Sequence, residues 1–147
     1  MPKPPPRLCA AGVTLRRQVD QRWPDRDRAS DGWIGDKAHQ ARKSDHNPDP
    51  NGWVRALDID ADLTKSAGRE RAWILADELR QYAASGLPGA CRILYIVYMG
   101  QITSGTYSKT KWKWRGKGYG HWGHIHVSFK PDGDLDGDKF PLKILSR

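Results

Sequence analysis

The chain has 147 residues, which suits one domain with a modest core, and 37% of its residues are hydrophobic. No apolar run approaches the ~20 residues of a membrane-spanning helix, which excludes an integral membrane protein of that kind. Lys and Arg total 25 against 17 Asp and Glu, and the net charge of +8 favours a polyanionic partner, either nucleic acid or an anionic cell-envelope polymer.

The N-terminal part predicts a leader followed by a helix. Residues 1–7 contain four prolines and are expected to be disordered, so that residues 8–147 form a single domain. The positively charged start is not followed by an apolar run, so we expect no secretory signal peptide. A helix that ends at Pro24 is predicted from four apolar residues at helical spacing: Leu8, Leu15, Val19 and Trp23.

The middle of the chain alternates between loops and regular elements. Residues 24–52 are rich in Asp, Arg, Gly, Asn and Pro and predict a long irregular segment, of a kind that is often functional. A strand is expected over residues 53–61, with Asp58 and Asp60 on one face. A helix is expected over residues 68–85, because its apolar residues form one stripe: Ala72, Leu75, Ala76, Leu79 and Tyr82.

The C-terminal part predicts a second strand pair. Residues 92–99 are largely apolar and favour a central strand, and residues 123–130 alternate like a strand. Residues 101–120 are rich in Gly, Ser, Lys and Trp and predict a second long loop. This order of elements indicates an α+β fold with a small antiparallel sheet and flanking helices.

Two cysteines, Cys9 and Cys91, do not make a disulfide framework, and their separation is not a metal-binding spacing. They are interpreted as free thiols, and a single Cys9–Cys91 bridge is the alternative.

The histidines carry the strongest chemical signal. Three of the five lie in the run HWGHIH, as His121, His124 and His126. On a strand, His124 and His126 point to the same face and can address one metal or one substrate. His46 and Asp58 complete two imidazoles and a carboxylate with His126, which is the donor set of a catalytic zinc site with an open position for water. An HxH pair also occurs on strands by chance, and a strand Asp is often only solvated.

The segments SDHNPDPNGWVRALDID and HWGHIHVSF resemble the zinc D-Ala-D-Ala carboxypeptidase and L-Ala–D-Glu endopeptidase family, whose fold is shared with Hedgehog domains. The family's Ser-x-His motif is matched by Ser44-Asp45-His46. By this resemblance, one zinc ion is bound by His46, Asp58 and His126. Asp60 is the rival ligand on the same strand face, and Asp58 is favoured because Ala56 precedes it as in the family motif.

The chain departs from the family pattern at two places. His46 and Asp58 are twelve residues apart, a longer gap than usual, which we interpret as an insertion of the turns at residues 47–52. Many members have a general-base glutamate three residues before the last ligand, where this chain has Gly123. Some members instead carry histidines five and two residues before that ligand, so His121 and His124 are expected to be catalytic, as general base, oxyanion donor or general acid.

Three further residues are candidates for substrate binding. Ser44 belongs to the first motif, and Arg42 could neutralise a substrate carboxylate or remain an exposed cation. Trp122 lies near Trp112, Trp114 and several lysines, where it could line a substrate groove, pack on the core or contact single-stranded nucleic acid. An Asp-Gly run at residues 132–138 lacks the final glutamate of a calcium loop and is interpreted as a solvated turn.

The resemblance implies a peptidase of bacterial peptidoglycan, similar to phage endolysins, expected to be a monomer without a membrane span. It would be made in the host cytoplasm and reach the wall on lysis, or act extracellularly. Two alternatives remain: a metal-bearing wall-binding module without turnover, and a basic nucleic-acid-binding protein, which would bind DNA with steep salt dependence and no need for zinc. Nucleic acid is not the expected partner.

Overall fold

The structure is a computed structural model that describes residues 2–35 and 44–146. The helices are α1 (Ala10–Arg22) and α3 (Gly68–Ala84), with 3-10 turns η1 (Ala90–Arg92), η2 (Ser108–Thr110), η3 (Pro131–Gly133) and η4 (Lys143–Leu145). The strands are β1 (Arg7–Leu8), β2 (Trp53–Val54), β3 (Ala56–Asp60), β4 (Ile93–Tyr98), β5 (Gln101–Ser104) and β6 (His124–Phe129).

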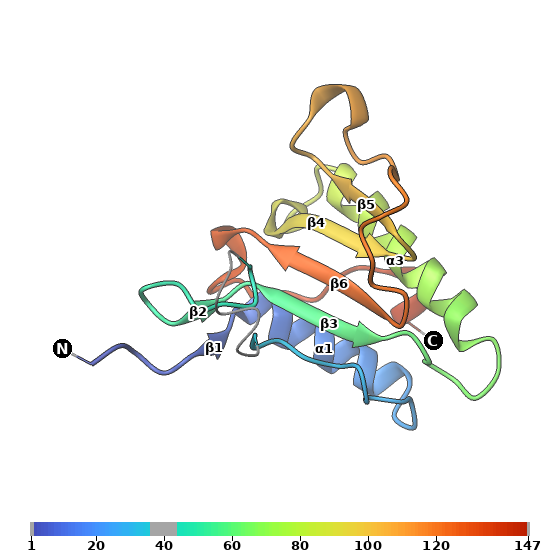
Figure 1. The fold of residues 1–147 in the computed structure, drawn as a ribbon, viewed down its shortest axis with the longest axis horizontal. Coiled ribbons are helices and arrows are strands. Elements are labelled where there is room, and N and C mark those ends of the chain that lie inside the picture. Colours follow the sequence, from blue (N-terminus) through green and yellow to red (C-terminus); the bar gives the residue numbers. More distant parts are fainter. Residues whose placement is uncertain (1, 36–43, 147) are drawn as a thin grey trace.

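Four strands form one antiparallel sheet in the order β3-β6-β4-β5, and β1 pairs in parallel with β2 in a separate ladder (Figure 1). The predicted α+β class with a small antiparallel sheet is confirmed. Although β6 comes last along the chain, it lies between β3 and β4. Its side chains are therefore placed in the middle of the sheet, where residues from two neighbouring strands meet them.

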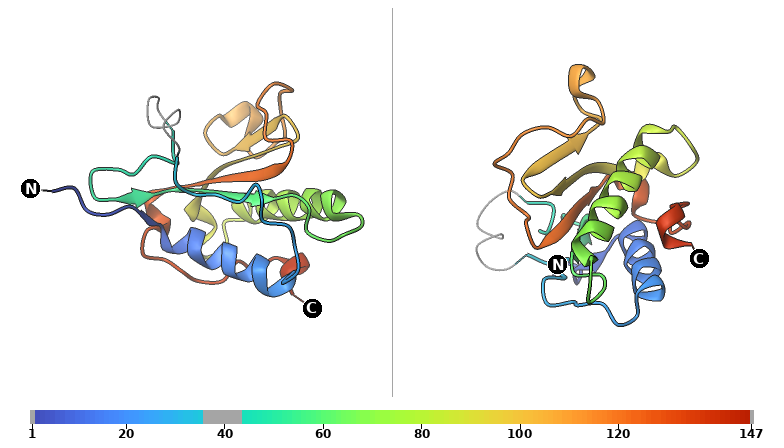
Figure 2. Two further views of the ribbon diagram at one scale, coloured as in Figure 1. Left: turned by 60° about the horizontal axis from the view of Figure 1, so that its bottom comes forward. Right: turned by 90° about the vertical axis from the view of Figure 1, so that its right-hand side faces the viewer.

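Helices α1 and α3 cover one face of the sheet (Figure 2), with α1 against β3 and α3 against β4. The predicted apolar stripe of α3 is buried, and full burial of a residue such as Leu75 or Leu79 contributes about 1.5–3 kcal/mol. The core between sheet and helices takes alternate residues of β3 and β6, and in β4 a register shift between Ile93 and Tyr95 puts both Ile93 and Ile96 on this face. The strand residues of the core are Leu57, Ile59, Ile93, Ile96, Ile125, Val127 and Phe129.

The alternation of side chains along each strand determines which residues lie on the sheet face opposite the helices. Successive strand side chains point to opposite sides, so the residues between the core positions face away from the helices. On β6 these are His124, His126 and Ser128, and on β3 they include Asp58 and Asp60. This helix-free face, which neither α1 nor α3 covers, therefore carries the polar residues, including the predicted metal ligands Asp58 and His126.

The strand predicted over residues 53–61 is divided at Arg55, which belongs to neither β2 nor β3. Its backbone N–H donates to the Asp45 carbonyl at 3.2 Å, and its guanidinium pairs with Asp49 and Asp134. These contacts of Arg55 hold the loop that carries His46 close to the start of β3 and thus close to the sheet.

The loop predicted over residues 101–120 is partly wrong, because it begins with β5 and contains η2. A two-residue turn joins β4 to β5, and both Met99 and Gly100 have positive φ, at +49° and +78°. Such a turn matches the twist of a hairpin, and Gly tolerates it without strain. The polar sequence of β5 suits a strand at the sheet edge. It lacks the alternation of apolar residues from which a strand is predicted.

Several smaller expectations have plain outcomes. Cys9 and Cys91 are both free thiols, the first buried and the second exposed. Arg7, the last residue of the predicted leader, pairs with Trp53 in the β1–β2 ladder. Among the residues that the structure describes, no helix is long and apolar enough to span a bilayer.

Candidate metal centre

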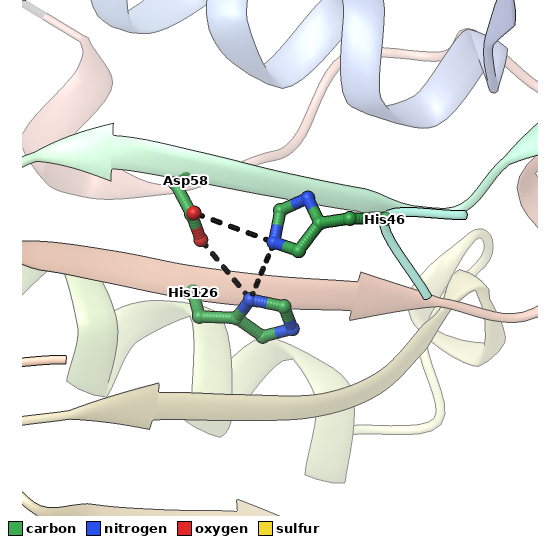
Figure 3. A group of neighbouring side chains, drawn as sticks. All are labelled: His46, Asp58 and His126. Carbon is green, nitrogen blue, oxygen red and sulfur yellow. Dashed lines mark hydrogen bonds and ion pairs between the residues drawn. The ribbon is translucent and has the colours of Figure 1, made fainter. Parts of the chain in front are cut away.

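The three predicted metal ligands converge on the helix-free face of the sheet (Figure 3). Asp58 on β3 and His126 on β6 are directly paired across the ladder, which places the His126 Nδ1 3.0 Å from Asp58 Oδ1. His46 reaches the pair from the loop before β2, with its Nε2 3.2 Å from His126 Nδ1 and 3.3 Å from Asp58 Oδ2. Both imidazoles are buried.

The loop fixes the orientation of His46 from two sides. Its Nδ1 lies 2.9 Å from the Trp33 carbonyl oxygen, and because a carbonyl only accepts, Nδ1 carries the proton. The His46 backbone N–H donates to Ser44 Oγ at 3.2 Å, a local turn contact. In the neutral imidazole, Nε2 is therefore the unprotonated nitrogen, and it faces Asp58 and His126 as a metal ligand requires.

His126 is oriented in the same way through its other ring nitrogen. Its Nε2 lies 2.7 Å from Ser128 Oγ, in fully buried surroundings, so that Nδ1 points toward Asp58. The Tyr95 ring on β4 stacks on the imidazole with 5.4 Å between ring centroids and 19° between planes. Hydrogen bonding at the second nitrogen is the usual means by which proteins fix the tautomer and direction of a histidine ligand.

Charge in the cluster is arranged around Asp58. Burial opposes ionisation of this carboxyl, but hydrogen bonds first from His126 and then from His46 hold its pKa well below the usual range. Burial is also the largest influence on His46 and opposes its charging, but the hydrogen bond and charge of Asp58, together with the Trp33 carbonyl and the Asp45 charge, outweigh it and raise the His46 pKa. The metal-free cluster therefore holds a carboxylate that attracts positive charge, which is a second requirement of a cation site.

The separations of the three groups fit a small tetrahedral ion. Ligand bonds of about 2.0–2.1 Å, the lengths usual for zinc, put tetrahedral ligands about 3.3 Å apart. The two imidazole nitrogens are 3.2 Å apart, and each lies close to a different Asp58 oxygen: His126 Nδ1 is 3.0 Å from Oδ1 and His46 Nε2 is 3.3 Å from Oδ2. His46, Asp58 and His126, each already oriented by the fold, therefore form a candidate metal-binding group.

His121 and His124 stand beside this group as a second pair. The His121 Nδ1 is 2.7 Å from His124 Nε2, and His124 Nε2 is 3.6 Å from Asp58 Oδ2. Burial, followed by the neighbouring His126 and His124, lowers the pKa of His121 to about 4. The two predicted catalytic histidines therefore lie within reach of a group bound at the three ligands, and His121 is neutral at physiological pH.

His121 has an unusual backbone conformation. Its φ is +59°, a left-handed region that costs a residue with a Cβ roughly 1–2 kcal/mol. Its carbonyl accepts from the Met99 N–H at 3.1 Å, which ties the segment to the β4–β5 turn. Backbone strain of this kind persists only where surrounding contacts stabilise it. This backbone conformation places the His121 ring beside the metal-binding group.

The rival ligand Asp60 is engaged elsewhere. Its Oδ2 accepts from the Ser30 backbone N–H at 2.9 Å and hydroxyl at 2.8 Å, and its Oδ1 accepts from the Asp62 N–H at 2.9 Å. It groups with Asp27 and Asp62 and not with the histidines. Asp60 thus organises the turn after β3, whereas Asp58 is the strand carboxylate that groups with His46 and His126.

The predicted substrate contacts are placed unevenly. Trp122 is 56% exposed next to the histidine pair, as a groove rim requires. The Ser44 hydroxyl supports the His46 backbone, and Arg42 lies outside the described residues. Sequence reasoning missed Trp33, Tyr95 and Ser128; only Ser128 had a visible signal, since it follows His126 by two residues on a strand and must share its face.

The comparisons with known proteins do not assign the chain to a family. No protein-family model matches it, and neither the curated proteins nor the solved structures give a significant match.

Proposed function

We propose that the protein is a zinc-dependent peptidase that hydrolyses a peptide bond in bacterial peptidoglycan. The observation that carries the proposal is the convergence of His46, Asp58 and His126 at zinc-ligand separations, with His121 and His124 directly beside them. The motif resemblance supplies the substrate class, and an endolysin-type enzyme released at lysis is the biological role that we favour.

Each group has a defined task in this proposal. His46, Asp58 and His126 would hold the zinc, which supplies a Lewis acid for the scissile carbonyl and acidifies water. The neutral His121 is able to accept a proton at pH 7, and the 2.7 Å contact to His124 allows that proton to pass between the rings. The exposed Trp122 offers an apolar surface to the substrate chain.

The test is digestion of purified peptidoglycan with and without chelator, followed by mass spectrometry of the fragments. We expect new amino termini that disappear with chelator and return with zinc, and the fragment masses identify L-Ala–D-Glu or D-Ala–diaminopimelate cleavage. Asp58→Ala should abolish release, whereas Asp132→Ala, which removes an exposed carboxylate of η3, should not.

Other outcomes point to the alternatives. Intact peptidoglycan in the presence of stoichiometric bound zinc would favour a metal-bearing wall-binding module. DNA binding that falls steeply with salt and is indifferent to zinc would favour the nucleic-acid reading of the +8 charge.

A further inference from the structure

A continuous row of residues crosses the helix-free face of the sheet from the metal-binding group to the far edge. Asp58 pairs with His126, His126 with Val97, and Val97 with Ile102. Beyond β5, Ile102 pairs with Arg115 through two backbone hydrogen bonds of 3.0 Å. Directly paired residues point to the same face, so Arg115 lies on the same face as the ligands, three strand spacings or about 14 Å from His126 between Cα atoms.

The Arg115 guanidinium is held in place by aromatic rings. It lies 5.5 Å from the Tyr107 ring centroid and 5.7 Å from that of Tyr119, and its Nη1 donates to the Tyr119 hydroxyl at 2.9 Å. Both tyrosines are exposed, so their edges line an accessible surface. The planar group is therefore fixed before any ligand arrives, which lowers the entropic cost of binding.

Arg115 lacks the acidic partner that the other well-packed arginines have. Arg26 pairs with Asp31, Arg55 pairs with Asp134, and Arg92 approaches Asp136. Within residues 2–35 and 44–146, Arg115 has no carboxylate partner, and its Nε is buried without a hydrogen-bond acceptor. The side chain as a whole is half-buried, so its uncompensated positive charge can attract an incoming carboxylate.

We propose that Arg115 binds a carboxylate of the substrate and makes the enzyme selective for acidic peptides. The inference rests on the proposed peptidase function and specifies its substrate. A guanidinium offers parallel donors that match a carboxylate better than a single charge does. Since an extended peptide advances ~3.3 Å per residue, the 14 Å row limits the recognised carboxylate to within about four residues of the scissile bond.

The test compares a cell-wall stem peptide that has free carboxylates with the same peptide after amidation. For the wild type we expect a KM about 10- to 100-fold lower for the acidic peptide at similar kcat, the range for a charge-assisted hydrogen bond. Arg115→Gln should remove this difference, and Arg115→Lys should restore only part of it because the planar fork is lost. Lys113→Ala, which removes an exposed charge from the same loop, should behave as wild type.

The outcomes separate the two claims. If the wild type cleaves both peptides with equal KM, or if Arg115→Gln keeps the preference, Arg115 is not the recognition group. If the wild type binds zinc but cleaves neither peptide nor intact peptidoglycan, the peptidase proposal fails and Arg115 loses its role with it. Zinc content and circular dichroism of Arg115→Gln, expected to match the wild type, show that the loss is not one of folding.

Discussion

His126 and Ser128 lie two residues apart on β6, and Nε2 of the histidine is 2.7 Å from Oγ of the serine. The contact is buried and engages Nε2, so that Nδ1 on the other side of the ring faces Asp58. Strand periodicity alone put the two side chains on one face, and this short contact makes Ser128 part of the metal-binding group.

Replacing Ser128 with Ala should weaken zinc binding by about 10- to 100-fold, because His126 loses the partner that fixes its tautomer and direction. Affinity is measured by competition with a chromophoric chelator. Ser104→Ala is the matched control, since Ser104 is also a buried strand serine, and within the described part of the chain its hydroxyl has no hydrogen bond to a histidine. Equal zinc affinity in Ser128→Ala and wild type would remove Ser128 from the metal-binding group.

Asp58 and Asp60 should respond differently to truncation, although they lie on the same strand face. Asp58→Ala should reduce zinc content to background. Asp60→Ala should retain full zinc content and lose about 1–3 kcal/mol of the free energy of unfolding, because the Ser30 and Asp62 donors become unpaired. Metal analysis and urea unfolding check both variants, and loss of zinc in Asp60→Ala would reopen the choice of ligand.

The two thiols should differ in reactivity. Burial is the largest cause that raises the pKa of Cys9, to about 11, whereas Cys91 is exposed. At pH 8 a thiol reagent should label one cysteine in the native protein and both in denaturant, and Cys91→Ser should abolish native labelling. Native labelling of two thiols would show that the region around Cys9 opens readily.

Much of the metal-binding group could be predicted from the sequence because its parts are local. His124, His126 and Ser128 share a face through strand alternation, and Asp58 is flanked by the apolar Leu57 and Ile59 that pin β3 to the core. The apolar stripe of α3 was equally readable for the same reason, since one helix face is a pattern within a single segment.

The remaining contacts depend on pairings that no local pattern encodes. Tyr95 meets His126 only because β4 and β6, about thirty residues apart along the chain, are neighbours in the sheet with a register shift between Ile93 and Tyr95. Arg115 lies on the same face because it forms a β-bridge with β5. This edge strand has a polar sequence, from which a loop was predicted. The contact of His46 with Trp33 depends on the conformation of the loop, which cannot be predicted from the amino-acid composition of the segment.

The pair His121 and His124 offers the most informative mutational comparison. Asn tolerates the positive φ of position 121, so His121→Asn removes the imidazole with little added strain, whereas Ala would combine both effects. We expect each of His121→Asn and His124→Asn to retain most of the zinc while the rate of peptide cleavage falls about 100-fold or more, in line with the loss of a proton-transfer group. Full activity in both variants would contradict their catalytic role.

The low pKa of His121 also has a consequence for stability, which is measured in the metal-free protein. Burial, with His126 and His124 next, depresses the pKa to about 4 from an unfolded value of about 6.5, so between these pH values the unfolded chain binds the extra proton. Stability contributed by the neutral ring is thus present above pH ~6.5 and declines as the pH falls toward 4. The free energy of unfolding of the wild type should therefore drop relative to that of His121→Asn over this window. Parallel pH profiles of the two proteins would show that His121 protonates as readily in the folded state as in the unfolded one, and that its ring is not held neutral beside the metal ligands.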